Sequence, residues 1–533
     1  MSRHPYIKHL GTKGFPSTAV RKVTHSVKPP LLHSAPDLPF PPANLRNGGT
    51  VALRTTPRSG TRQASQTPAT PTRSDRRTNR RAWTVVALLV VFQIIAFADK
   101  AVLGLVAPDA MAELGLTPTQ FGFIGSAFFF LYSIVSILTG VIASRVSVHW
   151  IVLSLGIVWA VVQFPMLLGG GAAMLLATRI ILGGAEGPAT AMSLTSAHTW
   201  FAPSARALPS NLIAIGSTMG PVIAAPALAL VISTWGWRWA FGALGLVGLV
   251  WCIAWICWGG SGPYLAKKQQ TGKTPDVAEA GEAEAETEAA TPSVDDQPAF
   301  PIWRVLLSLS FLAALVGAAS NFFVQGFLTT WLPQYLSTVV GLSLPQVGVV
   351  TTFPWVIGAL VLLLLGAVGH RLMQRGKTAH LAIASLFGLS TLAAGIFFLL
   401  VTVTTGYLSV FFLALAGGCS LVYPMSATAV SFCVGVRQRP IVMATLGGLA
   451  ATGAIVSPML VGQLMSRAGY VAPPKGVAPS PEMVTAMTTG VHSAFLITGI
   501  FLIIGGALCV LFLRPEKTVQ RLRNLMDDNP SRN

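Results

Sequence analysis

Four ionisable residues lie inside long apolar stretches of this sequence: Asp99, Lys100, Arg179 and Glu186. A charge at bilayer depth costs from about 3 to more than 10 kcal/mol, so charges there usually have a function. Two cations and two anions form a neutral set, which favours mutual pairing inside a helical bundle. Their chemistry suggests anion binding by a cation and proton exchange by carboxyl groups.

The spacing of Arg179 and Glu186 predicts that both side chains face the same way. Seven helical residues make nearly two turns, which separates the two positions by about 10 Å along the axis. We expect the pair to share one site, with Asp99 as the third member. Lys100 points about 100° away from Asp99 and is taken as a charge partner whose role is open. A static ion pair is the alternative interpretation of Arg179 and Glu186.

The composition indicates that a membrane surrounds these charges. The 533 residues are 52% hydrophobic and 10% charged, whereas soluble domains are about 25% charged. Apolar runs long enough to cross a bilayer predict an all-α membrane protein with twelve transmembrane helices in two six-helix halves. The expected helices are 83–107, 118–143, 149–168, 172–197, 205–233, 238–259, 304–337, 344–368, 379–402, 406–431, 440–464 and 489–513.

Polar segments divide the chain further. Residues 1–82 carry fifteen Lys and Arg but two acidic residues, and their Pro- and Ser-rich composition predicts a disordered basic tail. The expected N-terminal half is 83–259 and the C-terminal half is 304–513. An acidic, alanine-rich linker at 260–303 separates them, and 514–533 is expected to be a C-terminal tail.

Loop charges predict the orientation. Most basic loop residues fall on the same side as both tails, which the positive-inside rule assigns to the cytoplasm. The protein is therefore expected to be a multi-pass protein of the cytoplasmic, or inner, membrane with both termini cytoplasmic.

The two halves contain a weak internal repeat. Gly140 and Arg145 after the second helix match Gly366 and Arg371 after the eighth, an offset of 226 residues. Parallel repeats of this kind occur in the major facilitator fold, and these residues are expected to form cytoplasmic gate loops. The same offset relates Asp99 to Gln325.

The chain resembles the anion:cation symporter branch of the major facilitator superfamily over about residues 83–514. Phe97-Ala98-Asp99-Lys100 is similar to the aromatic-x-Asp-Arg motif of helix 1 in that branch, and Arg179 with Glu186-Gly187 is similar to its helix 4 motif. The branch includes bacterial sugar-acid and organic-acid:proton symporters and, more distantly, the sialin-type transporters. Lys100 replaces the usual Arg, so bidentate carboxylate geometry is lost there.

This resemblance implies a secondary active transporter that moves a small organic anion, such as a sugar acid or an aromatic acid, by proton symport and alternating access. Arg179 would bind the carboxylate, and Glu186 and Asp99 would carry the proton. Further substrate-binding residues are expected among Gln325, Asn321, Tyr132, Ser217, Trp331 and Tyr423. The expected partners are the anion, protons and the lipid bilayer, without nucleic acid, and a monomer is expected to suffice.

Other functions remain open at this stage. A drug:proton antiporter of the same fold is one, because Gly216-x-x-x-Gly220-Pro221 partly resembles the antiporter signature. An organophosphate:phosphate antiporter is disfavoured, because that class usually places an arginine in each half and the apolar part of the expected helix 304–337, after Arg304, has none. A non-transporting sensor derived from a transporter is another alternative. No nucleophile–base set, metal-ligand spacing or phosphate-binding loop is present in the sequence, so no enzymatic activity, cofactor or metal is predicted.

Overall fold

A computed structural model describes residues 73–142, 146–201, 205–263, 300–435, 438–474 and 477–527. Most of the expected tail (1–72) and linker (264–299), together with Arg145, lies outside the described residues. The expected all-helical fold is confirmed, because 85% of the structure is helical and the described residues contain no strand.

The first half consists of seven helical segments. They are α1 (Arg73–Leu114), α2 (Pro118–Ile142), α3 (Val148–Leu167), α4 (Ala172–Glu186), α5 (Ala189–His198), α6 (Ala207–Trp235) and α7 (Trp237–Trp258). α1 begins at Arg73, so residues 73–82, expected to belong to the disordered tail, are helical instead. The reason is that Arg is a good helix former and can continue a helix beyond its apolar part.

The expected fourth span is interrupted. α4 ends at Glu186, and α5 starts at Ala189 after Gly187-Pro188. Proline has no backbone N–H and its ring clashes with the preceding turn, which explains the break. Eleven helical segments of the described chain are long and apolar enough to cross a membrane. The divided α4–α5 segment supplies the twelfth expected span.

The second half has the same number of spans but more breaks. Its segments are α9 (Ile302–Leu306), α10 (Leu309–Thr330), α11 (Leu332–Thr338), α12 (Leu344–Val350), α13 (Phe353–Gln374), a π-helical turn η3 (His380–Ala384), α14 (Ser385–Val403), α15 (Gly406–Ser420), α16 (Pro424–Ser431), α17 (Arg439–Ala450), α18 (Thr452–Arg467), α19 (Pro481–Phe512) and α20 (Pro515–Asp527). Several of these segments start with a proline in the first turn, where its missing donor is tolerated.

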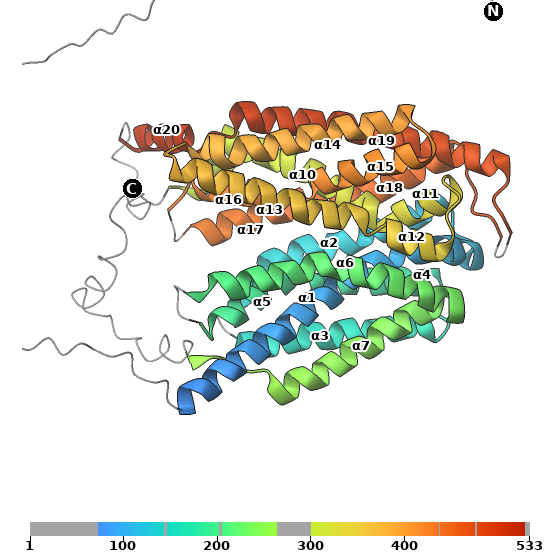
Figure 1. Ribbon diagram of the computed structural model, residues 1–533, viewed down its shortest axis with the longest axis horizontal. Helices are drawn as coiled ribbons and strands as arrows, with labels where there is room; N and C mark the ends of the chain where they lie inside the picture. The colour runs from blue at the N-terminus through green and yellow to red at the C-terminus, as the bar shows by residue number, and fades with distance from the viewer. Residues whose placement is uncertain are drawn as a thin grey trace, which may run out of the picture. The chain divides into compact units, whose positions relative to one another are not determined.

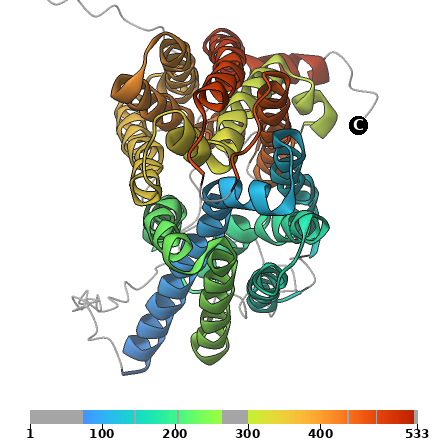
Figure 2. The same ribbon diagram turned by 90° about the vertical axis from the view of Figure 1, so that its right-hand side faces the viewer.

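The helices form two bundles that correspond to the two halves of the sequence. Viewed along the bundle axis, the blue-to-green helices of the first half lie together, and so do the yellow-to-red helices of the second (Figure 2). We call the end that carries the α1–α2 turn the distal end, and the end where α1 begins the proximal end. α20 follows α19 at the proximal end (Figure 1).

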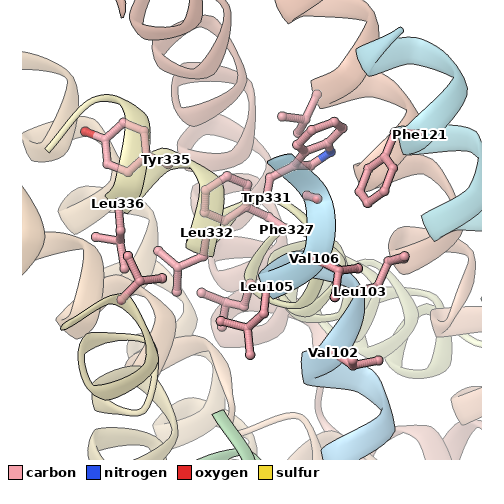
Figure 3. Packing of buried hydrophobic residues seen from close by; sticks show 14 of the residues in the cluster. Val102, Leu103, Leu105, Val106, Phe121, Phe327, Trp331, Leu332, Tyr335 and Leu336 are labelled. Carbon is pink, nitrogen blue, oxygen red and sulfur yellow. The ribbon is translucent and has the colours of Figure 1, made fainter. Parts of the chain in front are cut away.

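Apolar packing joins the two bundles near the distal end. Val102, Leu103, Leu105 and Val106 of α1 and Phe121 of α2 share a buried cluster with residues of α10 and α11 (Figure 3). The Trp331 indole belongs to this cluster, and its ring centroid lies 5.6 Å from that of Phe121. This cluster holds the two halves together on the distal side of the four charged residues.

Candidate functional site

The four charged residues predicted to form the site are all buried. Exposure is 1% for Asp99, 8% for Lys100, 1% for Arg179 and 2% for Glu186. No other Asp, Glu, Lys or Arg in the described chain is buried to this degree. α1 contributes the first two and α4 the last two, so the apolar sequence around each residue builds the helix that carries the charge into the bundle.

The pairing differs from the expected one. Lys100 Nζ lies 3.5 Å from Glu186 Oε2, whereas Arg179 turns towards Asp99 and α3. Arg179 Nη1 donates to the Asp99 backbone carbonyl at 3.4 Å. Arg179 and Glu186 lie about two turns apart on α4, and their contacts on α1 are to the adjacent residues Asp99 and Lys100. The predicted grouping of Arg179 with Glu186 is therefore replaced by a Lys100–Glu186 ion pair.

Gln163 of α3 connects the other two charges, and sequence reasoning missed it. Its Nε2 donates to Asp99 Oδ1 at 2.6 Å, and its Oε1 accepts from Arg179 Nη2 at 3.2 Å. The side chain is 1% exposed. The sequence feature that could have identified Gln163 is its amide inside the apolar span 149–168. A buried amide needs hydrogen-bond partners for both its oxygen and its nitrogen.

Aromatic rings surround the two cations. Lys100 Nζ lies 3.8 Å from the Phe97 ring centroid and 5.2 Å from that of Tyr132. The Arg179 guanidinium carbon lies 5.2 Å from the Phe241 ring centroid. Ring faces attract cations without neutralising them. The aromatic position of the helix 1 motif thus has a physical function here, since Phe97 precedes Lys100 by one turn.

Glycines allow α4 to contact the backbone of α2 directly. A methyl group at Gly183 would overlap the Phe128 carbonyl oxygen, and one at Gly187 would overlap the Tyr132 carbonyl oxygen. Only glycine permits this approach. The resulting contact fixes the depth of Glu186 next to α2.

Several polar atoms at the site have no hydrogen-bond partner among the described residues. They are Arg179 Nε and both carboxylate oxygens of Glu186. Buried polar groups are normally satisfied, and exceptions often mark a site of function or an unseen water. Arg179 thus keeps one donor, Nε, without a partner in the described part of the chain, and the Glu186 carboxylate is in an ion pair with Lys100.

A small cavity lies between the halves at this site. It is lined by Asp99, Lys100, Leu103, Gly125, Phe128, Phe129, Arg179, Thr329 and Thr330. Its water-accessible volume is about 10 Å³, which is room for about one water molecule. Thr329 and Thr330 are the residues that α10 contributes, and neither was predicted from the sequence.

The other predicted substrate-binding residues of the second half lie in different surroundings. Asn321 Nδ2 donates to Gly317 O at 2.7 Å and to Thr391 Oγ1 at 3.1 Å, so it connects α10 to α14. Trp331 is fully buried and donates to Pro458 O at 2.9 Å. Neither residue lines the cavity around the charges. Both are used for helix packing in this conformation.

Gln325, Tyr132, Tyr423 and Ser217 complete the predicted set. Gln325 is buried in α10, one turn before Thr329. Tyr132 lies beside Lys100, whereas the Tyr423 ring packs 4.8 Å from that of Phe322. Ser217 of α6 accepts a hydrogen bond from Gln93 of α1, and Gln93 also donates to Thr190 of α5. Ser217 therefore connects helices and is not in contact with the four charged residues.

The predicted gate residues are only partly placed. Gly140 falls in the last turn of α2, and Arg371 is exposed in the last turn of α13. Gly366 does not make a close helix contact, because a methyl group there would have no neighbour within 4 Å. Gly369 does make such a contact, since a methyl group there would lie 2.6 Å from the Ala382 carbonyl oxygen. The helical register thus favours the glycine one turn later.

Hydrogen bonds between the halves, among described residues, join α2 to α18. Thr119 Oγ1 and Ser466 Oγ are 2.9 Å apart, and Met459 N donates to Ser126 Oγ at 3.2 Å. Glycines again allow close contact, because a methyl group at Gly122 would overlap Pro458 O and one at Gly462 would overlap Pro118 O. We call this contact the α2–α18 seam. It lies on the distal side of the four charges.

Two helical bundles, with a buried charge network in the first bundle beside a cavity that both halves line, are the arrangement of a membrane transporter. The Major Facilitator Superfamily model matches residues 88–389, and the chain belongs to this family. The predicted family and fold are confirmed, and the family assignment makes the chain a transporter rather than an enzyme.

Known proteins resemble the chain over most of its length. A hexuronate transporter of Bacillus subtilis is 27% identical over 72% of this chain and 88% of its own. A probable sulfoacetate transporter of Cupriavidus necator is 25% identical over 82% of this chain and 94% of its own. Among solved structures, a bacterial homologue of the lysosomal transporter Spinster has a TM-score of 0.65 and 19% identity, covering 83% of this chain and 98% of that one.

Proposed function

We propose that this protein moves a small organic anion, such as a sugar acid or an aromatic acid, across the cytoplasmic membrane by proton symport. Both termini would face the cytoplasm, and one chain would suffice. The observation that carries the proposal is the charge network of Asp99, Lys100, Arg179 and Glu186, three of which line a cavity between the two halves. Relatives named as hexuronate, sulfoacetate and galactonate transporters support an anionic substrate.

Arg179 is the proposed anion-binding residue. Its guanidinium remains charged at any physiological pH and offers a planar set of donors that fits a carboxylate. One of those donors, Nε, has no partner among the described residues. Its other contacts are to neutral groups, the Gln163 amide and the Asp99 backbone carbonyl. No side-chain carboxylate in hydrogen-bond contact therefore has to be displaced from Arg179 before an anion binds.

Glu186, together with Asp99, is the proposed proton carrier. The Glu186 carboxylate lies 3.5 Å from Lys100 Nζ and has no hydrogen-bond donor among the described residues beyond this ion pair. Protonation of Glu186 would release Lys100 from the ion pair. Lys100 would then add a second positive charge to the cavity that Arg179 also lines. Proton uptake and anion binding would in this way favour each other, as symport requires.

Substrate binding in this mechanism requires the halves to separate. A cavity of about 10 Å³ cannot hold an organic acid, so the site is closed in this conformation. The α2–α18 seam is well placed to act as the distal gate, because it joins the halves next to the cavity. Rocking of one bundle against the other would open and close this seam in alternation with the proximal end.

The glycine signature that raised the antiporter alternative has a packing function. A methyl group at Gly216 would lie 2.8 Å from Val90 O, and one at Gly220 would lie 2.6 Å from Phe97 Cβ. These glycines let α6 approach α1. They give no support to an antiporter, and the two buried cations are unfavourable for cationic drugs.

The direct test is transport by purified protein in liposomes. A thermal-shift screen against hexuronates, aldonates, aromatic acids and short dicarboxylates would first identify a ligand. That ligand should then accumulate in liposomes under an inward proton gradient, and accumulation should stop when an ionophore removes the gradient. Binding without accumulation would contradict symport and favour a sensor. Accumulation driven by an exchanged internal anion at equal pH would contradict proton coupling.

A further inference from the structure

An unassigned groove lies at the proximal end of the second half. It is formed by α9, the start of α10, the end of α19 and α20, and its water-accessible volume is about 940 Å³. Small-molecule sites are typically about 300–1,000 Å³, so the groove is large. It lies outside the charge network described above, and none of its lining residues contributes to the proposed transport site.

One wall of the groove is basic. Arg304, Arg514, Lys517 and Arg521 line it, and no acidic residue is among the lining side chains. Lys517 and Arg521 are four residues apart on α20, so they project from the same helix face. Among the described residues, none of the four basic side chains has an acidic group within salt-bridge distance. Arg514 Nε is buried and has no hydrogen-bond partner there.

Exposed apolar residues also line the groove, and we call them its apolar wall. Exposure is 67% for Leu307, 52% for Leu309 and 53% for Leu511, and Phe512 is 39% exposed. Trp303 is 60% exposed at the groove, and its ring lies 5.2 Å from the Arg304 guanidinium carbon. Aromatic and basic residues at the end of a membrane helix are typical of the headgroup level of a bilayer.

The groove is held in place by contacts to the bundle. Ser310 Oγ lies 2.6 Å from Thr518 Oγ1, and Glu516 accepts from the backbone N–H groups of Ala379 and His380. Val519 and Leu522 are buried against the second half. Arg304 donates to Leu525 O near the end of α20. α20 is therefore fixed to the bundle with its basic face directed along the groove.

We infer that this groove binds a phospholipid with a net negative headgroup. The basic wall provides the charge for a phosphodiester, and the exposed apolar wall provides a surface for acyl chains. A soluble anion would leave the apolar wall uncovered, and a zwitterionic lipid would leave the basic wall without its counter-charge. The combination favours an anionic lipid such as phosphatidylglycerol.

The test is lipid binding by the full chain in detergent, measured by native mass spectrometry. Phosphatidylglycerol and phosphatidylcholine of equal chain length serve as probes. The Lys517→Gln/Arg521→Gln variant removes two basic groups from the groove. Arg375→Gln/Arg523→Gln is the matched control, because both residues are exposed basic residues absent from the groove lining and the change in net charge is equal.

Phosphatidylglycerol should bind more tightly than phosphatidylcholine. Its affinity should fall about fivefold for each basic residue lost from the groove, or about thirtyfold for the pair, and remain unchanged in the control. Equal binding of phosphatidylglycerol by both double variants would overturn the inference. This outcome would also be expected if the acidic segment 279–288 of the linker, and not a lipid, occupied the groove. Competition by glycerol 3-phosphate as strong as that by a short-chain phosphatidylglycerol would also overturn it, because the site would then recognise a soluble anion. Equal unfolding temperatures without lipid would show that both variants are folded.

Discussion

Lys100 and Glu186 form a buried ion pair between α1 and α4, with side chains 5% and 0% exposed. The replacement of arginine by lysine in the helix 1 motif therefore does not leave the cation without a function. A lysine is a compact charge on a flexible stem, which suits a single carboxylate partner better than a bidentate one. Its partner is the proposed proton carrier, so this contact is the most direct place to test the mechanism.

Glu186→Gln should abolish uptake driven by a proton gradient but retain exchange of labelled for unlabelled substrate. The amide has nearly the same shape as the protonated carboxyl group but cannot release a proton. Both activities can be measured in the same liposomes. Concentrative uptake that survives the change would exclude Glu186 as the coupling group.

Lys100→Met should destabilise the protein by about 3–5 kcal/mol, because it leaves Glu186 buried without its counter-charge. Adding Glu186→Gln to Lys100→Met should restore most of the lost stability, since no buried charge remains at that pair. Thermal unfolding in detergent measures both effects. If Lys100→Met and the double variant are equally stable, the ion pair has no energetic importance.

Arg179→Lys should lower substrate affinity by at least about tenfold although the charge is retained, because the planar set of donors is lost. The ligand-induced thermal shift would measure this loss. Arg238→Lys is a suitable control, since Arg238 pairs with Glu113 at 2.9 Å, away from the cavity. Equal affinities in the two variants would show that Arg179 does not bind the carboxylate.

Gln163→Leu should raise the half-saturating substrate concentration and lower stability by about 1–3 kcal/mol, because Asp99 and Arg179 each lose a buried partner. Gln93→Leu provides the comparison, since Gln93 is equally buried and donates to Thr190 and Ser217. It should cost similar stability but leave the half-saturating concentration unchanged. If both variants alter transport equally, Gln163 is only a packing residue.

Thr119→Cys/Ser466→Cys, in a background without the five native cysteines, should form a disulfide that closes the α2–α18 seam. Oxidation should block transport, and a reductant should restore it. Ser147→Cys/Ser261→Cys is the control, because its two hydroxyl oxygens are 3.3 Å apart and both lie in the first half. Transport that continues after full crosslinking at the seam would contradict its role as a gate.

The fold and the four charged residues could be predicted because they depend on large, local effects. An apolar run of membrane length has few alternatives to a helix, and a charge inside such a run is costly enough to be noticed. The sequence also contains the cause of the break after Glu186, which is the pair Gly187-Pro188, but the expected span 172–197 runs through it. Fine boundaries of this kind depend on a single residue such as Pro188.

The pairing of the site could not be predicted, because it depends on which helices are neighbours. Lys100 meets Glu186, and Gln163 meets both Asp99 and Arg179, only because α1, α3 and α4 come together at this depth. The offset between the halves indicated Gln325, yet Thr329, one turn later, lines the cavity. A weak repeat identifies the helix that faces the site but not the residue on it.

The glycines on both sides of α2 have a mechanical consequence. On one side, α4 lies directly on the α2 backbone at Gly183 and Gly187, so no side chain can yield between them. On the other side, Gly122 and Gly462 bring α2 equally close to α18. The two contacts differ in that α2 and α4 belong to the same half, whereas α18 belongs to the other. In the proposed rocking movement α4 would therefore travel with α2 and carry Glu186 with it, and the α2–α18 seam is the close contact that would have to part.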